Sequence, residues 1–226
     1  MYEILMRLPI FNGVTYSRLE EVVGNTKFHF LKYLKGDKII EPGEQCTHIK
    51  FIISGSTRVS IVNADGRFKV SQTLSMPDVI APEYLFGKAT RYPISAIALE
   101  PTGILQIEKQ EFLKILNTDP IFLINMLNLL SVTAQRSAEG VLALTTGSLE
   151  ERIAFWIVAL TQRRGTDIVL SCRQRDLYSL FGVQRTSFIA TLDDMKERGL
   201  IDYTQHEIMI KSRADMLSLL ASATEE

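Results

Sequence analysis

The stretch from Arg173 to Ile210 constrains the fold more than any other part of this chain. Three apolar residues recur at helical spacing in its first part: Leu177, Leu180 and Phe181. Gly182 then breaks the pattern, and glycine tolerates the positive φ that a tight turn between two helices requires. The sequence therefore predicts a short helix that ends in a sharp turn.

A second helix and a small hairpin follow this turn. The second helix keeps its apolar residues on one face: Val183, Phe188, Leu192 and Met195. Gly199 follows its last turn, as is typical of a helix C-cap. Two short strand-like runs, Leu200–Tyr203 and Ile208–Ile210, flank the polar residues Thr204–Glu207. The order of elements predicts a winged helix-turn-helix.

Polar side chains gather at the start of the second helix, where a helix used only for packing has no need of them. They are Gln184, Arg185, Thr186 and Ser187, with Ala190 one turn further on. In a helix-turn-helix this end of the second helix meets base edges, and the first helix crosses the DNA backbone. We therefore expect three residues at the start of the first helix to join the DNA contact: Arg173, Gln174 and Arg175. The alternative is a plain pair of packing helices.

The overall charge does not indicate a nucleic-acid partner. The formal net charge is −1, and residues 148–226 carry ten Lys and Arg against twelve Asp and Glu. Five arginines nevertheless cluster in one short stretch: Arg163, Arg164, Arg173, Arg175 and Arg185. Only Asp167 and Asp176 interrupt this cluster, and phosphate contacts need only a local basic surface. A scatter of solvated arginines is the alternative interpretation.

Composition and cysteine usage indicate a soluble globular protein of the cytoplasm. The 226 residues are 46% hydrophobic, which is enough for two small domains or one large one. Cys46 and Cys172 match neither a disulfide framework nor a metal motif. The N-terminus lacks a signal-peptide core, and no apolar run approaches the ~18 residues of a membrane span. We therefore expect no membrane partner.

The first half of the chain is rich in short strand-like runs. Asp65-Gly66 between Arg58–Val62 and Phe68–Thr73 predicts a β-hairpin. Several such runs over residues 28–110 predict a small β-roll or barrel. A short helix from Ser17 to Val23 is expected before it, with Ser17 as N-cap and Glu20 three residues later.

One long helix is predicted from Pro120 to about Thr146, because proline suits a first turn. Seven of its residues follow an unbroken 4-3-4-3-4-3 spacing: Leu123, Leu127, Leu130, Ala134, Ser137, Val141 and Leu144. This spacing favours the seam of a two-helix dimer over packing against the helix's own domain.

The last zone opens with a capping box of Ser148 and Glu151, which predicts a helix to about Arg163 that Gly165 ends. A strand is expected over Asp167–Ser171. The chain is therefore predicted to be an α+β protein in three zones: a β-roll, or double-stranded β-helix, sensor over residues 1–119, a dimerisation helix over 120–146 and a winged helix-turn-helix over 147–226.

This order of parts resembles the Crp/Fnr family of bacterial transcription regulators. The resemblance rests on KGDKIIEPGE, FIISGSTRVSI and DLYSLFGVQRTSFIATLDDMKERGLID. It implies a homodimer that binds a pseudo-palindromic operator in double-stranded DNA, with Arg185 reading a guanine. Cyclic-AMP-responsive members often carry a glutamate where Thr186 stands and an arginine where Ala190 stands, so a different operator sequence is expected. The resemblance also implies a contact with RNA polymerase near residues 163–167.

The sensor zone departs from the cyclic-nucleotide-binding members of that family. Ala81-Pro82 stands where they carry Gly-Glu, and Ile94-Ser95 stands where they carry Arg-Ser. An aliphatic side chain cannot neutralise a phosphate, so cyclic AMP is not the expected effector. Residues matching the family's effector pocket are Ala81, Pro82, Glu83, Arg91, Ser95 and Ser137. A hydrophobic effector and a filled pocket both stay open.

Other classes of function fit the residues less well. Two cysteines are too few for the family's iron–sulfur branch, a lone histidine is weak support for haem, and no cofactor is expected. A cupin-type metal enzyme would need clustered histidines, and the β-zone holds only His29 and His48. The sequence contains no recognisable catalytic triad and no glycine-rich loop that would bind a phosphate. We therefore expect no enzyme activity, catalytic residue or metal site. A ligand-sensing module without DNA binding is the third alternative.

Overall fold

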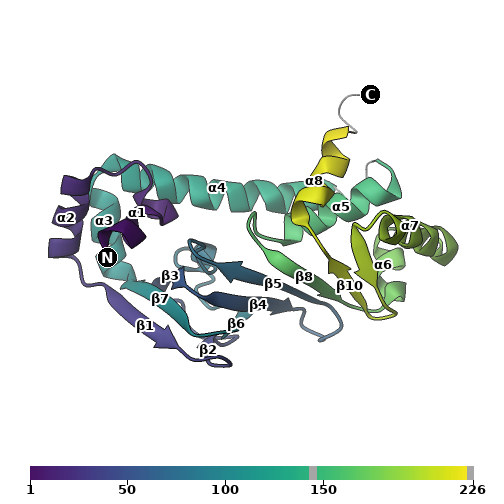
Figure 1. Cartoon of the computed structure of the whole chain (residues 1–226), viewed down its shortest axis with the longest axis horizontal. Helices are drawn as coiled ribbons and strands as arrows, with labels where there is room; N and C mark the ends of the chain where they lie inside the picture. The colour runs from purple at the N-terminus through teal and green to yellow at the C-terminus, as the bar shows by residue number, and fades with distance from the viewer. Residues whose placement is uncertain (143–146, 223–226) are drawn as a thin grey trace. The chain divides into compact units, whose positions relative to one another are not determined.

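The computed structural model describes residues 1–142 and 147–222 (Figure 1). The end of the predicted long helix, with its seam residue Leu144, lies outside the described residues. Contacts divide the chain into two compact units. Unit 1 consists of Met1–Val59 and Leu74–Thr133, and unit 2 consists of Ser60–Thr73 and Ala134–Glu226.

The helices of unit 1 flank its sheets. They are α1 (Tyr2–Met6), η1 (Pro9–Phe11), α2 (Tyr16–Asn25), η2 (Pro82–Tyr84), α3 (Lys109–Thr118) and the first part of α4 (Pro120–Leu142). The N-cap of α2 is Thr15, whose Oγ1 accepts a hydrogen bond from the backbone N–H of Arg18 at 3.4 Å. The prediction of Ser17 as N-cap was wrong, because Ser17 already lies inside the helix. Thr15 has the extended backbone that capping requires.

The strands of unit 1 form the predicted β-roll. They are β1 (His29–Tyr33), β2 (Lys38–Ile40), β3 (His48–Ser54), β6 (Ile94–Ala98), β7 (Thr102–Glu108) and the first part of β4 (Ser56–Val62). One sheet has the order β1-β7-β3, and β2, β6 and β4 are neighbours in the other. Their inner faces bury a large aliphatic and aromatic core that includes Phe51, Leu105 and Phe112.

The hairpin predicted at Asp65-Gly66 joins β4 to β5 (Lys69–Ser75). Its turn is wider than two residues and runs from Asn63 to Phe68. The backbone N–H of Asn63 donates to the Phe68 carbonyl at 2.9 Å, and the N–H of Phe68 donates to Asn63 Oδ1 at 2.8 Å. Gly66 supplies the positive φ, +71°, that this turn needs.

Unit 2 packs four further helices against a small sheet. The elements are α5 (Leu149–Leu160), β8 (Thr166–Ser171), α6 (Gln174–Leu180), α7 (Arg185–Glu197), β9 (Ile201–Tyr203), β10 (Glu207–Ile210) and α8 (Arg213–Ser222). The sheet has the order β5-β8-β10-β9 within this unit. The helix-turn-helix and its wing are therefore confirmed. Helix α5 ends at Leu160 rather than near Arg163, because Thr161 turns to an extended backbone.

Helix α4 begins at Pro120, as predicted, and its first turns anchor it to unit 1. Phe122 and Met126 are buried in the core of that unit. The Asn125 side-chain amide donates to the carbonyls of Ile10 and Asn12 at 3.0 and 2.8 Å. These contacts fix one face of the helix and leave the opposite face uncovered by unit 1.

Within residues 1–142 and 147–222, no single helix has the length and apolar character needed to cross a bilayer. Helices α3 and α4 reach that composition only when taken as a pair, and the pair is bent by 119°.

Candidate nucleic-acid interface

Helix α5 begins with the capping box that the sequence predicted. The backbone N–H of Glu151 donates to Ser148 Oγ at 3.2 Å, and the N–H of Ser148 donates to Glu151 Oε2 at 2.7 Å. One turn into the helix, Arg152 Nη2 donates to the carbonyl of Phe181 at 2.6 Å. This bond ties the start of α5 to the turn that separates α6 from α7.

Aromatic packing holds the two helices of the motif together. The Phe188 ring stacks on Phe181 at 6.4 Å, and Trp156 meets Phe181 edge-on at 5.6 Å. Gly182 adopts a φ of +65°, so the chain turns sharply at the predicted position. Leu180, one of the three apolar residues at helical spacing in the sequence, is 45% exposed. Helix α6 ends at Leu180, and only Leu177 and Phe181, four residues apart, share its buried face.

The start of α7 is exposed and lacks a side-chain cap. Gln184 occupies the N-cap position without a capping hydrogen bond. Free backbone N–H groups at a helix start carry partial positive charge, and the guanidinium of Arg185 adds a full charge there. Four of the predicted DNA-binding residues on α7 are exposed: Arg185, Thr186, Ser187 and Ala190. This end of α7 is therefore suited to an anionic partner.

The start of α6 lies beside the wing. Arg173 and Arg175 are exposed, whereas Gln174 is half-buried and its Nε2 donates to the carbonyl of Thr204 at 3.1 Å. Thr204 Oγ1 in turn accepts the backbone N–H groups of His206 and Glu207 at 3.2 and 3.1 Å. Gln174 therefore fixes the wing turn to α6, which places the wing and α6's two arginines at one end of the unit.

Acidic residues on the second half of α7 have local partners. Asp193 accepts a hydrogen bond from the Tyr203 hydroxyl, which raises the pKa of Tyr203 to about 12. Asp194 pairs with Arg198 at 3.3 Å. Asp202 on β9 pairs with Lys196 at 2.7 Å, and this hydrogen bond lowers the pKa of the Asp202 carboxyl. These carboxylates are engaged away from the start of α7.

The predicted seam of α4 is largely exposed in the single chain. Leu123, Leu127 and Val141 are 46%, 53% and 68% exposed. Ala134 and Ser137 are also exposed, whereas Leu130 is half-buried against the core of unit 1. Two aliphatic residues outside the predicted seam, Ile124 and Val132, are exposed as well. The exposed apolar stripe is therefore wider than a strict heptad seam.

The turn that begins at Ala81 has an unusual backbone conformation. Ala81 is buried and has a φ of +46°, a conformation that alanine adopts only at a cost in free energy. Pro82 is also buried, and Glu83 is exposed. The side chain of Ile94 is buried, so an apolar group fills the position that the sequence resemblance matched to a phosphate-binding arginine. The side chains of Ala81 and Ile94 thus supply no charge or hydrogen-bonding group to an effector.

The remaining predicted pocket residues have separate roles. Arg91 is exposed, and its Nη1 donates to the Gly43 carbonyl at 2.8 Å. Ser95 is half-buried on β6, and Ser137 is exposed on the part of α4 that belongs to unit 2. Behind Arg91, the buried Tyr92 hydroxyl accepts a hydrogen bond from Cys46 Sγ at 2.8 Å, and burial raises the pKa of Tyr92. Bulky side chains therefore occupy the interior beside this loop.

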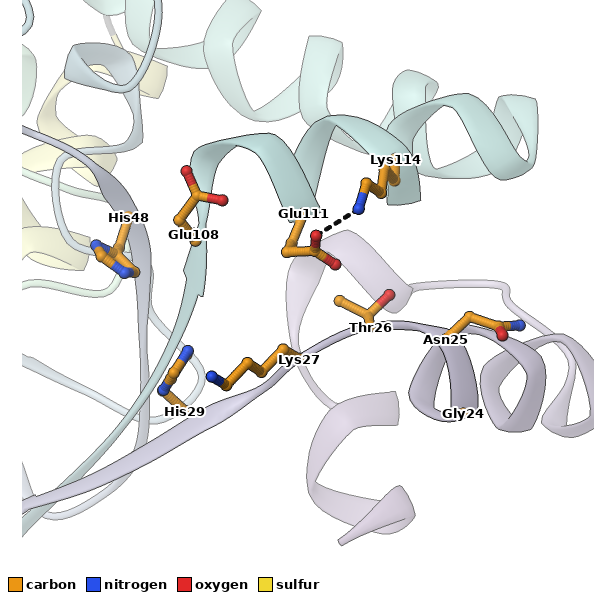
Figure 2. Close-up of a pocket in the computed structure, with 9 residues that line it drawn as sticks. All are labelled: Gly24, Asn25, Thr26, Lys27, His29, His48, Glu108, Glu111 and Lys114. Atoms are coloured by element: carbon orange, nitrogen blue, oxygen red, sulfur yellow. Dashed lines mark hydrogen bonds and ion pairs between the residues drawn. The ribbon is translucent and has the colours of Figure 1, made fainter.

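A polar hollow of about 700 Å³ lies elsewhere on unit 1 (Figure 2). It is lined by Gly24, Asn25, Thr26, Lys27, His29, His48, Glu108, Glu111 and Lys114. None of these residues belongs to the predicted effector pocket. The rings of His29 and His48 meet edge-on at 6.2 Å, and Glu111 is engaged by Lys114 at 2.5 Å. Among the described residues, no three His, Cys, Asp or Glu side chains form a group that holds a metal ion.

Two family models match the chain: Cyclic nucleotide-binding domain over residues 30–119 and Crp-like helix-turn-helix domain over residues 151–219. The Cyclic AMP receptor protein of Thermus thermophilus is 24% identical over 196 residues, covering 85% of this chain and 88% of that protein. The nitrogen fixation regulation protein FixK of Azorhizobium caulinodans is 20% identical over 197 residues, covering 83% and 77%. The crystal structure of the Thermus thermophilus catabolite activator protein matches with a TM-score of 0.55 and 18% identity, covering 95% and 99%.

Proposed function

The chain belongs to the Crp/Fnr family of DNA-binding transcription regulators, and on that premise we propose how its parts bind DNA. The observation that supports DNA binding most directly is the start of α7, which is exposed, lacks a side-chain cap and bears Arg185. Its helix buries the opposite face through Phe188 and Leu192, so the polar end is held rigidly outward. We infer that this end enters the major groove, where the guanidinium fork of Arg185 contacts O6 and N7 of a guanine.

The residues around α7 then divide by role. Gln184, Thr186 and Ser187 share its exposed first turn and complete the base contact, with Ala190 offering an apolar surface. Arg173 and Arg175 at the start of α6 contact phosphates, which positions the motif without reading sequence. The same end of the unit holds the wing, fixed by the bond between Gln174 and Thr204. The motif therefore offers both kinds of contact.

We propose that the DNA-binding form is a homodimer paired along α4. The exposed residues Leu123, Leu127 and Val141 support this pairing, because contiguous exposed apolar surface marks a site of protein–protein contact. Two copies of α7 related by a two-fold axis would read half-sites about 34 Å apart, one turn of DNA. The operator is therefore expected to be pseudo-palindromic.

Selection of binding sequences from a random duplex library tests base readout. We expect the wild-type chain to enrich one pseudo-palindromic sequence, and Arg185→Ala to lose affinity for it by about 5–150-fold for each half-site, or about 1–3 kcal/mol. Arg175→Ala is expected to weaken all sequences alike, because a phosphate contact carries no sequence information. Equal affinity of the wild type and Arg185→Ala for every sequence would refute direct readout by Arg185.

Arg164→Ala is the matched control for charge. Arg164 is exposed and precedes β8, whereas Arg173 follows its end, so the two lie about 20 Å apart at ~3.3 Å per strand residue. We expect its removal to leave DNA binding unchanged. An absence of salt-dependent DNA affinity in the wild type would favour a ligand-sensing module without DNA binding.

We propose that the effector is not cyclic AMP, although the Thermus relative carries that ligand in its name. The proposal rests on the buried side chains of Ala81 and Ile94, which cannot replace a charge-assisted contact to a cyclic phosphate. Cyclic AMP at millimolar concentration is then expected to leave the affinity for the selected operator unchanged. A tenfold change in affinity would overturn this assignment.

The proposal also includes a partner beyond DNA. Arg163 and Arg164 form an exposed turn before β8, in the region where the family resemblance implies contact with RNA polymerase. We propose that this turn contacts the polymerase in the cytoplasm, and no catalytic activity is part of the proposal. Transcription from the selected operator in vitro should fall with Arg164→Ala while DNA affinity stays constant. Unchanged transcription would refute the contact.

A further inference from the structure

The hairpin segment Ser60–Thr73 is built into unit 2, although it lies between strands of the β-roll in the sequence. Strand β5 pairs antiparallel with β8 (Figure 1). Lys69 lies opposite Ser171, Val70 opposite Leu170 and Ser71 opposite Val169. The wing sheet therefore gains a fourth strand from a distant part of the chain.

Side chains of the hairpin segment help to build the core of unit 2. Val70 is 3% exposed among the residues of that core, and Phe68 packs on Trp156 with ring centroids 5.4 Å apart. Gln72 Oε1 accepts the backbone N–H of Gln162 at 2.8 Å. Successive side chains of a strand point to opposite faces, so Lys69 points away from this core. Lys69 is exposed, in agreement with that geometry.

The register places Lys69 at the end of the sheet that carries the DNA-binding residues. Ser171 lies between Lys69 on β5 and Glu207 on β10, and Arg173 follows it by two residues. The wing turn lies at this same end, because the backbone N–H of Cys172 donates to the His206 carbonyl at 2.8 Å. Lys69 is therefore a neighbour of the start of α6 and of the wing.

Lys69 is the available cation of the hairpin turn. Arg67 is held by the carboxylate of Asp65, with Nε donating to Oδ2 at 2.6 Å. That bond raises the pKa of the Arg67 guanidinium, and Asp176 of α6 raises it further, which is consistent with the turn lying beside α6. Over the part of the chain that the structure describes, Lys69 has no ion pair or side-chain hydrogen bond. Glu207 lies two strands away, or about 10 Å at the usual strand spacing.

We propose that the hairpin segment is a third DNA-contacting element and that Lys69 binds a backbone phosphate of duplex DNA. This inference rests on the proposed DNA-binding function and extends it to a residue from the first half of the chain. The contact depends on the pairing of β5 with β8, so this segment from the first half of the chain takes part directly in holding DNA.

Binding to a 30-base-pair duplex of mixed sequence, measured by fluorescence anisotropy at several salt concentrations, tests the proposal. Each lost phosphate contact reduces the slope of log K against log[salt] by about 0.9. Lys69→Gln is expected to reduce the slope by that amount for each bound protomer. At 0.1 M salt this corresponds to a loss of about eightfold in affinity for each bound protomer, if affinity at 1 M salt is unchanged. Lys69→Arg should retain the wild-type slope.

Lys211→Gln is the matched control, because Lys211 is exposed and follows β10 at the opposite end of the same sheet. We expect this variant to keep the wild-type slope. Suppose that Lys69→Gln keeps the wild-type slope while Arg185→Ala still loses its sequence preference. This result would overturn the inference about Lys69 and leave the proposed DNA-binding function standing. Equal reductions in Lys69→Gln and Lys211→Gln would also overturn it, as a general effect of charge. An absence of DNA binding by the wild type would overturn both.

Discussion

The buried lysine of unit 1 offers a quantitative test of the structure. Lys50 on β3 is 4% exposed, and its Nζ lies 3.7 Å from Glu44 Oε1 and 5.3 Å from the centre of the Tyr92 ring. At 3.7 Å two unit charges attract by about 4 kcal/mol at an effective dielectric constant of 20 and by about 1 kcal/mol in water. The Glu44 side chain is 43% exposed, so the true value lies near the lower figure.

Two substitutions are therefore expected to act in opposite ways. Glu44→Gln leaves the ammonium of Lys50 buried without its carboxylate, and we expect a loss of about 1–2 kcal/mol in the free energy of unfolding. The glutamine can still accept the backbone N–H of Glu41, which now donates to Glu44 Oε2 at 3.2 Å. Lys50→Met removes the buried charge and keeps an unbranched side chain that is one atom shorter. It is expected to be neutral or stabilising, because removing a buried charge offsets the loss of a desolvated cation–π contact of about 2 kcal/mol.

Urea unfolding of the full chain separates these effects from changes in the second unit. Circular dichroism reports both units, whereas the single tryptophan, Trp156, lies in unit 2. A loss of 1–2 kcal/mol shifts a midpoint by about 0.5–1 M urea. We expect this shift in the dichroism transition of Glu44→Gln, whereas the midpoint of its fluorescence transition should equal that of the wild type. In the Lys50→Met background, Glu44→Gln should cost less than about 0.5 kcal/mol. A larger loss for Lys50→Met than for Glu44→Gln would refute the reasoning.

Three further predictions follow from local features. Ser148→Ala removes one half of a capping box and should lower the stability of unit 2 by about 1 kcal/mol, measured by the fluorescence of Trp156 in urea; an unchanged midpoint would contradict the role of the cap. Burial, together with the nearby Lys50 and His29, lowers the pKa of His48 in the folded chain. The unfolded chain therefore takes up a proton on His48 at a higher pH than the folded chain does, and the free energy of unfolding falls as the pH drops below about 6.5. His48→Gln should flatten that dependence in urea titrations at pH 5 to 8, and an equal slope would exclude His48 as its source. Burial raises the pKa of Cys172 to about 12, so alkylation by iodoacetamide at pH 8 should be far slower in the folded chain than in urea, and equal rates would contradict the burial.

Features encoded over a few residues were predictable from the sequence. The glycines Gly182 and Gly199 adopt φ values of +65° and +76° at the ends of α6 and α7, where the turn and the cap require them. Ser148 and Glu151 form the predicted capping box. Each of these features depends on chemistry within about four residues, so the local pattern is enough to specify it. The DNA-binding residues were predicted from the positions where the two helices of the motif begin.

Features that depend on distant pairing were not predictable in the same way. Strand β5 was expected in a hairpin with β4, and that hairpin is confirmed. Its second neighbour, β8, lies about a hundred residues further on, and an alternating strand pattern does not specify which free edge it joins. Lys69 was therefore absent from the predicted interface. The exposure of Leu180 has a similar origin, because the end of a short helix decides which of its apolar residues face the core.

The distribution of charge explains how a chain with a net charge of −1 presents a surface to a polyanion. The acidic residues near α7 lie on its second half and on β9, and Tyr203, Arg198 and Lys196 engage them there. The cations Lys69, Arg173, Arg175 and Arg185, by contrast, have no carboxylate partner within the described residues. Exposed charges are screened beyond about 10 Å at 0.1 M salt, so a phosphate at the start of α7 is governed by these near cations rather than by the net charge. Glu207, in the same row of the sheet as Lys69, and Asp176, in the first turn of α6, are acidic residues near these cations, and they limit rather than cancel the local potential.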